Sequence, residues 1–469
     1  MILIEPMSTE KRRPSAMDRA ARVVKKRLRG LRLRMAGPGR AERERIERRT
    51  RLTPLFNAED YSLIHKDIAR TGLTPLAHFA TVGLKERRPT LRPLGVARIL
   101  HDINVRHERD AAAFLTAFEA AQHEPGLEVF AAARTVVIAV HSHANYYMHP
   151  IAEALAHALR AAGCDCKLVN ERDPALVAAD FPIIIAPHEF FSMPGSARLR
   201  EYAFLSRAIL FNTEQMPSKW FAEAQRWMFS ARAVLDVSFQ TTMALGPNFP
   251  ALHVLPPFDD EQLKASHADH DPSHPIFQAN ARPLFDWADQ RPISTRAFDL
   301  FFAGFKTPER SRLFVRNAAY FADKHCFLAY SSLPGEPVRM GTDSQAIFPT
   351  NLSVARNSRI ILAIHRYSVG YFEWERMVAQ GFATGACVIA SPSLPSPFFK
   401  AGVHYFETIS RNLDKLIRWV LDTDEGIEAA QNAAHAARQV MLNQLTAPRV
   451  GRHILSFLKS LEVRSDVRS

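Results

Sequence analysis

Cysteine is scarce in this sequence, and long apolar runs are absent. Four cysteines in 469 residues cannot form the dense framework that holds small secreted domains together. No stretch of about 18 consecutive apolar residues occurs, so no membrane-spanning helix is predicted. The first residues, MILIEPMSTEKRRPS, carry charges where an export signal needs an apolar core. We therefore expect a cytoplasmic protein.

Patterns for two kinds of site are also missing. The dinucleotide fingerprint G-x-G-x-x-G does not occur, which argues against a dinucleotide cofactor. The segment HSHANYYMH, with His141, His143 and His149, has no Cys or carboxylate beside it to complete a zinc site. We expect no metal and no bound cofactor. Cys164 and Cys166 could bind a metal or act in redox chemistry, but we interpret them as part of a turn between a helix and a strand.

Positive charge is concentrated at the start of the chain. The formal net charge is +12, and residues 1–51 alone hold 17 Lys and Arg against 6 Asp and Glu, a net of +11. The remainder is close to neutral, which argues against a broad nucleic-acid surface on the folded body. Between Arg19 and Met35, apolar residues form a narrow stripe that suits a helix lying on an anionic membrane surface. A solvated, disordered tail and an RNA-binding tail are the alternatives.

The first half of the chain contains three buried strands that each end in polar residues. TVVIAV, FPIIIA and RAILF are apolar runs typical of parallel strands covered on both faces. They are followed by His141 and His143, by His188 and Glu189, and by Glu214. Because parallel strands end at one edge of a sheet, we expect these groups to converge there. A carboxylate or imidazole at that edge could act as a general base; capping of the following helices is the alternative role.

The second half has the same alternation, best seen between Asn351 and Ser391. His365 and Arg366 directly follow the strand IILAI. A helix comes next, and Gly385 ends this helix before the strand ACVIAS. Polar residues past the carboxyl end of a parallel strand and beside a helix N-terminus are placed as nucleotide-binding groups are in open α/β sheets. The stretch therefore predicts a nucleotide site.

The segment FEWERMVAQGFATGACVIAS resembles the nucleotide-sugar-binding segment of GT-B glycosyltransferases of the "glycosyl transferases group 1" type. The resemblance implies an α/β fold with two Rossmann-like domains, whose parallel sheets face each other across a cleft. It also implies that Glu373, with Glu375 as second choice, holds the donor ribose. Many retaining members carry a second glutamate seven residues later, and this sequence has Gln380 there, so the paired motif is broken.

The same resemblance assigns the remaining donor contacts and the acceptor side. Phosphate contacts are expected from the loop after the strand FDLFFAGF and from the loop after IILAI, and an aromatic residue is expected to flank the base. The expected donor-binding residues are Gly304, Lys306, Arg310, His365, Arg366, Tyr371, Phe372 and Glu373. The acceptor is expected at His141, His143, Glu189 and Glu214. No metal is needed where cations and helix dipoles stabilise a departing diphosphate.

A short helical module precedes these domains. Residues 52–93 fit the pattern F-[DN]-x-E-x-Y…D-[IV]-A…G-x-x-P-L-x-H-[FY]…G, which resembles a module found beside bacterial polysaccharide glycosyltransferases. We interpret Tyr61 and His78 as packing residues. The expected parts, in chain order, are a disordered or membrane-surface tail (1–50), the module (51–95), a helical connector (96–134), an acceptor domain (135–290), a nucleotide-sugar domain (291–445) and a final helix (446–469).

The sequence thus predicts a metal-independent, hexosyltransferase-like glycosyltransferase. It would move a sugar from a nucleotide-sugar donor to a glycan or lipid-linked acceptor in bacterial surface polysaccharide synthesis, in the cytoplasm or peripherally on the inner membrane. Two other hypotheses remain open. One is a catalytically silent GT-B-like scaffold, favoured by Gln380. The other is a basic-tailed nucleic-acid-binding protein.

Overall fold

The computed structural model describes residues 38–216, 218–257, 263–264, 273, 275–278, 284–287, 292–331, 347–366 and 370–466. Contacts divide the chain into two units, Met1–Val96 and Ala97–Ser469. The membrane-surface helix expected between Arg19 and Met35, and most of residues 258–291 around the expected domain boundary, lie outside the described residues. No helix among the described residues is long and apolar enough to cross a membrane.

The first unit is a small helical module. Its helices are α2 (Arg40–Arg51), α3 (Ala58–Ile64), η1 (Lys66–Arg70), α4 (Pro75–His78) and the π-helical turn η2 (Phe79–Gly83). The Asn57 side chain caps α3 by accepting a hydrogen bond from the Asp60 N–H. The Tyr61 hydroxyl and His78 Nδ1 lie 3.1 Å apart in the interior, and a Cβ at Gly83 would overlap with that hydroxyl. Tyr61 and His78 are therefore packing residues, as expected.

The module begins earlier than the sequence indicated. We expected residues 1–50 to form a tail, but α2 packs on the module, and its Ile46 is only 1% exposed. The apolar contact of Ile46 holds this arginine-rich helix against the other helices. The expected tail therefore ends before Arg40.

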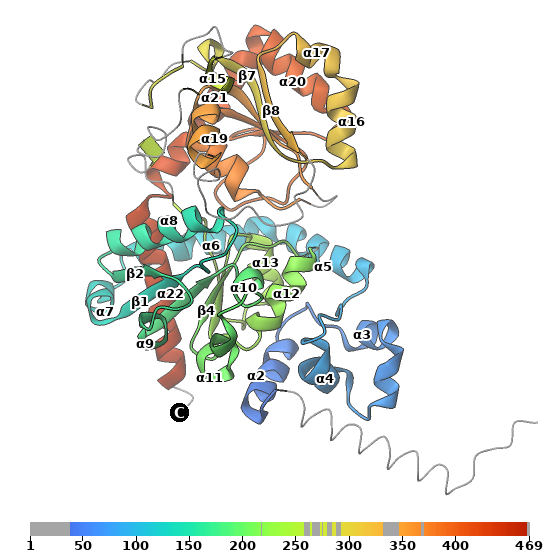
Figure 1. Ribbon diagram of the computed structural model, residues 1–469, viewed down its shortest axis with the longest axis vertical. Helices are drawn as coiled ribbons and strands as arrows, with labels where there is room; N and C mark the ends of the chain where they lie inside the picture. The colour runs from blue at the N-terminus through green and yellow to red at the C-terminus, as the bar shows by residue number, and fades with distance from the viewer. Residues whose placement is uncertain are drawn as a thin grey trace, which may run out of the picture. The chain divides into compact units, whose positions relative to one another are not determined.

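The second unit contains two parallel sheets, each covered by helices (Figure 1). The first has the order β2-β1-β3-β4-β5-β6. Its strands are β1 (Thr135–Ala139), β2 (Asp165–Val169), β3 (Phe181–Ile185), β4 (Ile209–Asn212), β5 (Ala233–Asp236) and β6 (Ala251–His253). The connecting helices include α8 (Met148–Ala161), α10 (Pro187–Phe190), α12 (Lys219–Met228) and α13 (Phe239–Leu245).

The second sheet has the order β11-β10-β9-β7-β8, and all its pairs are parallel. Its strands are β7 (Phe298–Phe305), β8 (Cys326–Ser331), β9 (Ser358–Ala363), β10 (Cys387–Ala390) and β11 (Phe406–Glu407). Its helices include α16 (Pro308–Arg316), α17 (Ala318–Ala322), α19 (Ile347–Arg356), α20 (Leu413–Asp422) and α21 (Asp424–Asn443). The expected helix after Glu373 is present as η5 (Trp374–Phe382), with π-helical geometry, which is frequent near functional sites.

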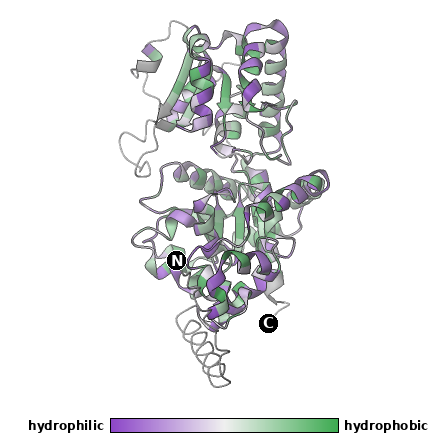
Figure 2. Cartoon of the chain, turned by 90° about the vertical axis from the view of Figure 1, so that its right-hand side faces the viewer, coloured by the Kyte–Doolittle hydropathy of each residue, from purple (hydrophilic) through white to green (hydrophobic). Residues whose placement is uncertain are grey.

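Helices at both ends of the unit pack on the first sheet. α5 (Pro93–Val105), α6 (His107–Gln122) and α7 (Leu127–Ala133) precede β1, and the last helix, α22 (Ala447–Asp466), returns to contact α6, α7 and α8. An ion pair of 2.8 Å between Arg134 and Glu462 fixes one end of α22. Two parallel α/β sheets in tandem, with a final helix that returns to the first, form the expected GT-B fold. Figure 2 shows apolar residues concentrated in the strands of both sheets.

Candidate functional site

Strand order locates the most favourable binding positions in each sheet. In open α/β sheets, ligands bind outside the carboxyl ends of strands, at the point where the strand order reverses. The first sheet reverses between β1 and β3, and the second between β7 and β9. His141 and His143 follow β1, and Glu189 follows β3. Three of the four sequence-predicted acceptor residues therefore follow the strands of the switch point, whereas Glu214 follows β4.

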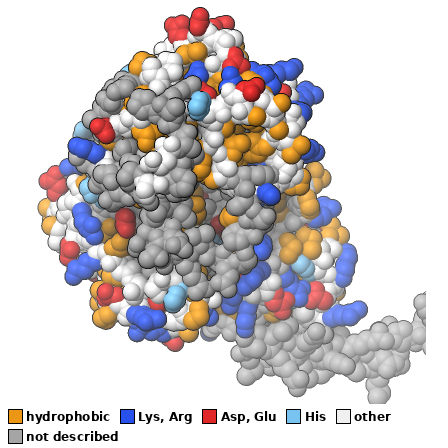
Figure 3. Space-filling view, turned by 45° about the horizontal axis from the view of Figure 1, so that its top comes forward, with side chains coloured by type: hydrophobic (Ala, Val, Ile, Leu, Met, Phe, Trp, Pro, Cys, Tyr) orange, Lys and Arg blue, Asp and Glu red, His pale blue; other side chains and the backbone are white. Residues whose placement is uncertain are grey.

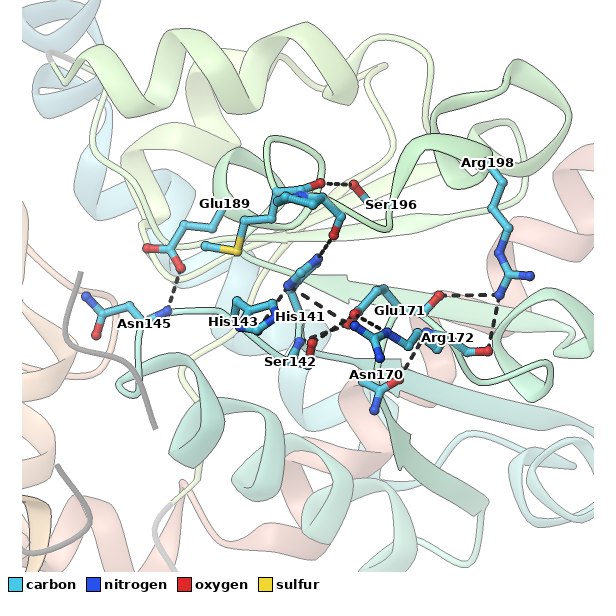
Figure 4. A network of polar contacts seen from close by, with 12 residues as sticks. His141, Ser142, His143, Asn145, Asn170, Glu171, Arg172, Glu189, Ser196 and Arg198 are labelled. Carbon is cyan, nitrogen blue, oxygen red and sulfur yellow. Dashed lines mark hydrogen bonds and ion pairs between the residues drawn. The ribbon is translucent and has the colours of Figure 1, made fainter. Parts of the chain in front are cut away.

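His141 is fully buried, and both of its ring nitrogens have partners (Figure 4). Nδ1 accepts a hydrogen bond from the backbone N–H of His143 at 3.1 Å, and Nε2 lies 2.8 Å from the carbonyl oxygen of Pro194. This pattern assigns the proton to Nε2. Burial lowers the pKa of His141, so the ring is neutral and holds the loop together. These contacts give His141 a structural role, and its expected acceptor contact stays a prediction; the side chain of His143 is exposed.

Glu171, two residues past the end of β2, is a site residue that the sequence reasoning missed. Its buried carboxylate accepts hydrogen bonds from the backbone N–H and the hydroxyl of Ser142 at 2.9 and 2.8 Å (Figure 4). Burial by itself would raise the pKa of Glu171, but these hydrogen bonds hold it below its ordinary value. Applying the strand-end rule to CKLVN would have found this residue, which orders the loop after β1.

Glu189 and Glu214 lie on either side of one buried imidazole. His188 Nε2 is 3.4 Å from a carboxylate oxygen of Glu214 and 3.8 Å from one of Glu189. The Glu189 carboxylate also accepts the backbone N–H of Asn145 at 2.8 Å (Figure 4), and Glu214 accepts the Ser218 hydroxyl at 3.0 Å. The structure therefore brings together the groups that follow β1, β3 and β4.

The turn that presents these groups is strained. Ala186, directly after β3, has φ = 50°, a left-handed conformation that a non-glycine residue adopts at a cost of about 1–2 kcal/mol. Such strain persists where the surrounding packing imposes it, and it is frequent at functional sites. It turns the chain sharply into α10, so that His188 and Glu189 both lie at the sheet edge.

The protonation states of this group are shifted by burial. Burial raises the pKa of Glu189, and it raises the pKa of Glu214 with an added contribution from the charge of Glu189. Burial lowers the pKa of His188 to about 3, so this ring is neutral at physiological pH. A carboxylate whose pKa is raised accepts a proton more readily than an ordinary one, which is the property a general base needs.

Arg366 brings the second sheet into this site. It follows β9, and its positive charge opposes the rise in the pKa of Glu214 that burial causes. Its side chain is exposed, like that of Lys306 after β7. The two cations therefore follow the two strands between which the order of the second sheet reverses.

Arg310 faces the interior of the second sheet, and Gly304 lies in β7 beside Tyr330 of β8. The Arg310 guanidinium donates from Nη1 to the carbonyl oxygen of Phe305 at 2.9 Å and from Nε to that of Ile364 at 3.0 Å. It thus ties the ends of β7 and β9 together. The expected phosphate contact of Arg310 stays a prediction, and the observed contacts give it a positioning role.

The aromatic residues expected to flank the base are buried. Phe372 stacks on Phe399 with ring centroids 5.4 Å apart and lies in the core. Tyr371 is buried as well, and its hydroxyl lies beside the Thr241 hydroxyl and the Met216 backbone without the geometry of a hydrogen bond to either. The apolar surface of both rings packs against neighbouring side chains, and their expected contact with the base stays a prediction.

The residues expected to mark the ribose site lie at and within η5. Glu373, the first-choice ribose contact, directly precedes the helix with a half-buried side chain. Gln380, at the position of the missing second glutamate, is buried in η5. Nothing in the structure tests the ribose contact, which stays a prediction.

Buried polar atoms without a hydrogen bond mark both sheet edges. Among the described residues, His188 Nδ1, Gln215 Oε1 and Ser391 Oγ have no hydrogen-bond partner. They follow β3, β4 and β10, respectively. Buried polar groups in proteins are nearly always satisfied, so these atoms call for water or ligand partners at the carboxyl ends of the strands.

The described residues contain no group of three or more His, Cys, Asp or Glu placed to hold a metal ion. Cys164 and Cys166 are free and buried, and burial raises their pKa values to about 11 and about 12. Thiols with such pKa values are poor nucleophiles and poor metal ligands at neutral pH. The two cysteines therefore pack as small apolar residues beside α8.

Gly370 allows a close approach that shapes the loop after β9. A Cβ at this position would overlap with the ring of His365, which is itself buried. We expect Gly370→Ala to displace the His365 ring and the loop with it, and to weaken nucleotide-sugar binding at least tenfold, which corresponds to about 1.4 kcal/mol. Calorimetric titration measures this effect. Gly39→Ala, where a Cβ meets nothing within 4 Å, serves as the control, and unchanged binding in Gly370→Ala would contradict the prediction.

No family model matches the chain, and no curated protein matches it. Several solved structures are similar. HepE of Anabaena, in complex with UDP-glucose, is 11% identical, with a TM-score of 0.47 over 70% of this chain and 100% of that one. Sucrose-phosphate synthase of Thermosynechococcus elongatus is 10% identical (0.42, 71% and 100%), and a glycosyltransferase of Rickettsia africae is 12% identical (0.39, 70% and 98%). These scores are below 0.5, and the GT-B fold of this chain is defined by its own strand order and connections.

Proposed function

We propose that this protein is a glycosyltransferase that moves a sugar from a nucleotide-sugar donor to a hydroxyl of a glycan or lipid-linked acceptor. One observation carries the proposal. The carboxyl groups of Glu189 and Glu214, which follow β3 and β4, lie on either side of the His188 imidazole, and the positive charge of Arg366 acts on Glu214. This arrangement supplies a proton acceptor beside a cation, the two groups needed when a sugar hydroxyl displaces a diphosphate.

The donor diphosphate is assigned to the switch point of the second sheet. Lys306 and Arg366 supply positive charge there, and the positive end of the α16 dipole adds to it. The guanidinium of Arg310 holds the ends of β7 and β9 together. Glu373 is the ribose contact in this proposal, because a carboxylate at the start of a helix can accept hydrogen bonds from both ribose hydroxyls.

On the acceptor side, Glu214 accepts the proton of the attacking hydroxyl, and Glu189 accepts a second hydroxyl of the same sugar. No metal takes part in this scheme, since arginine, lysine and helix dipoles provide the charge. The acceptor is assigned to surface polysaccharide synthesis, with the basic residues 1–37 bringing the protein to an anionic inner membrane.

The experiment is a thermal-shift screen against UDP-, GDP-, CMP- and dTDP-sugars. A ligand at about 100 times its Kd adds about 2.7 kcal/mol to the free energy of unfolding, which raises Tm by several degrees. We expect one nucleotide family to raise Tm in the wild type and in Glu428→Gln, an exposed control on α21. The shift should be lost in Glu373→Gln. An equal shift in Glu373→Gln removes the ribose role, and no shift with any donor overturns the proposal.

The two other hypotheses predict different results. A silent scaffold keeps its cellular function in Glu373→Gln and Glu214→Gln, whereas an enzyme loses it. A nucleic-acid-binding tail loses its binding when residues 1–37 are deleted, while sugar transfer in solution persists. The deletion should stop at residue 37 because α2 belongs to the module. Figure 3 shows Lys and Arg side chains scattered among acidic ones on one face of the molecule, with no broad basic patch there.

A further inference from the structure

Trp220 is unusual among the aromatic residues of this chain. It is 42% exposed, and among the described residues no other Phe, Tyr or Trp is exposed. Trp227, two turns further along the same helix, is 6% exposed. Tryptophan carries the largest aromatic surface of any residue, so leaving it in water forgoes considerable burial energy. An exposed tryptophan beside buried polar groups therefore marks a binding surface.

The position of Trp220 is fixed relative to the carboxyl pair. Its ring centroid lies 6.0 Å from that of His188, whose Nε2 faces Glu214 and Glu189. Ser218 connects the same elements, because its oxygen accepts the Phe221 N–H at 2.9 Å to cap α12 and donates to Glu214. The exposed indole therefore lies beside the buried imidazole, which in turn contacts the two partly exposed carboxyl groups, and these residues come from α10, α12 and the end of β4.

The chemistry of this surface matches a saccharide. The C–H face of a pyranose ring is apolar and slightly positive, and it complements the negative face of an indole. The hydroxyls at the ring edge donate to carboxylates in charge-assisted hydrogen bonds. Gln215 Oε1, buried and without a hydrogen bond among the described residues, is a further acceptor next to Glu214.

We propose that Trp220 is the stacking platform of a pyranose subsite, in which the acceptor sugar lies on the indole and directs its hydroxyls to Glu214 and Glu189. This inference rests on the proposed function and specifies its acceptor as a saccharide ring. A nucleic-acid base could also stack on an indole, but its phosphates would meet two carboxyl groups. The adjacent Lys219, with Nζ 4.7 Å from the indole centroid, covers part of the ring and so contributes to which sugars fit.

The test compares Trp220→Phe with Trp220→Gln. Phenylalanine keeps an aromatic face, whereas glutamine has similar reach without one. The probes are the methyl glycosides of glucose, galactose, mannose and N-acetylglucosamine at millimolar concentration, where ligands with a Kd of about 1 mM bind measurably. Saturation-transfer NMR detects the sugar C–H protons that contact the protein. Gln225→Ala, at a half-buried position of the same helix, is the matched control.

We expect at least one glycoside to bind the wild type through its ring C–H protons. Trp220→Gln should weaken that binding about tenfold, the scale of about 1.4 kcal/mol for one lost aromatic contact. Trp220→Phe should retain part of it, and Gln225→Ala should bind like the wild type. Equal binding in Trp220→Phe and Trp220→Gln overturns the inference, as does the absence of binding by all four glycosides to the wild type.

Donor binding separates this inference from the proposed function. All three variants should keep the Tm rise caused by the nucleotide sugar. Trp220 lies in α12, beside the first sheet, whereas the proposed donor site lies at the second sheet. A variant that keeps this rise is folded. If the donor raises Tm but no glycoside binds, the subsite is wrong while the proposed function stands. If glycosides bind and no donor does, the proposed function fails.

Discussion

Glu214→Gln is expected to lower the rate of sugar transfer by about two to four orders of magnitude, the usual contribution of a general base. Glutamine keeps the shape of the side chain and can still contact the Ser218 hydroxyl, but it cannot accept a proton from the attacking sugar. The measurement is kcat with the donor identified by thermal shift and a saccharide acceptor. Glu201→Gln, at an exposed position in the same half of the chain, should keep full activity.

The same substitution is expected to stabilise the protein. The pKa of Glu214 is raised above its ordinary value of 4.5, first by burial. The native state therefore binds this proton more tightly than the unfolded chain does, and the contribution to stability is fully present below pH 4.5. It is lost as the pH rises through the raised pKa. At neutral pH the wild type carries a buried charge that glutamine removes.

Melting curves and rate profiles over pH test both expectations for Glu214→Gln, the gain in stability and the loss of activity. Tm of Glu214→Gln should exceed that of the wild type near pH 7, and the difference should shrink toward pH 4.5. The wild-type rate should rise with pH through the raised pKa, because only the ionised carboxyl accepts the proton. An unchanged kcat in Glu214→Gln would refute the assignment of the base, and an unchanged Tm would show that the native carboxylate carries no burial cost.

Gly451→Ala is expected to lower Tm by several degrees. Gly451 lies in α22 where this helix crosses α8, and a Cβ there would overlap with the carbonyl oxygen of Ala158. It would also lie 2.7 Å from the carbonyl carbon of Ala158 and 2.8 Å from Cβ of Ala162. Overpacking costs about 1–3 kcal/mol, and a backbone carbonyl cannot move without its helix. This cost exceeds the gain of about 0.5–1 kcal/mol that alanine brings to a helix interior.

The comparison needs a second substitution in the same helix. Ser456→Ala, at a half-buried position of α22, adds no atom and should change Tm little. Denaturant unfolding of both variants gives the free energies directly. A Gly451→Ala protein as stable as the wild type would mean that α22 shifts along α8 at little cost. A loss of stability confined to Gly451→Ala would show that α22 is held by its close contact with α8.

The order of elements could be read from the sequence because it depends on local patterns. IILAI overlaps β9 and TVVIAV contains β1, since continuous apolar runs of this length are typical of strands covered on both faces. The rule that parallel strands end together placed Glu189 and Glu214 at one edge. The alternation of strands and helices and the place of the polar strand ends therefore followed from periodicity, whereas the GT-B arrangement was implied by the resemblance.

What each side chain contacts was decided by the tertiary structure. Nothing near His141 in the sequence indicates that its ring is held by the carbonyl of Pro194, 53 residues away. The sequence suggests that Arg310 is a phosphate ligand. In the structure its guanidinium donates hydrogen bonds to two carbonyl groups at the ends of β7 and β9. The exposure of Trp220 likewise depends on which residues cover the start of α12. Local pattern fixes where strands and helices form, whereas the partners of a polar side chain depend on unsatisfied groups that distant segments bring to it.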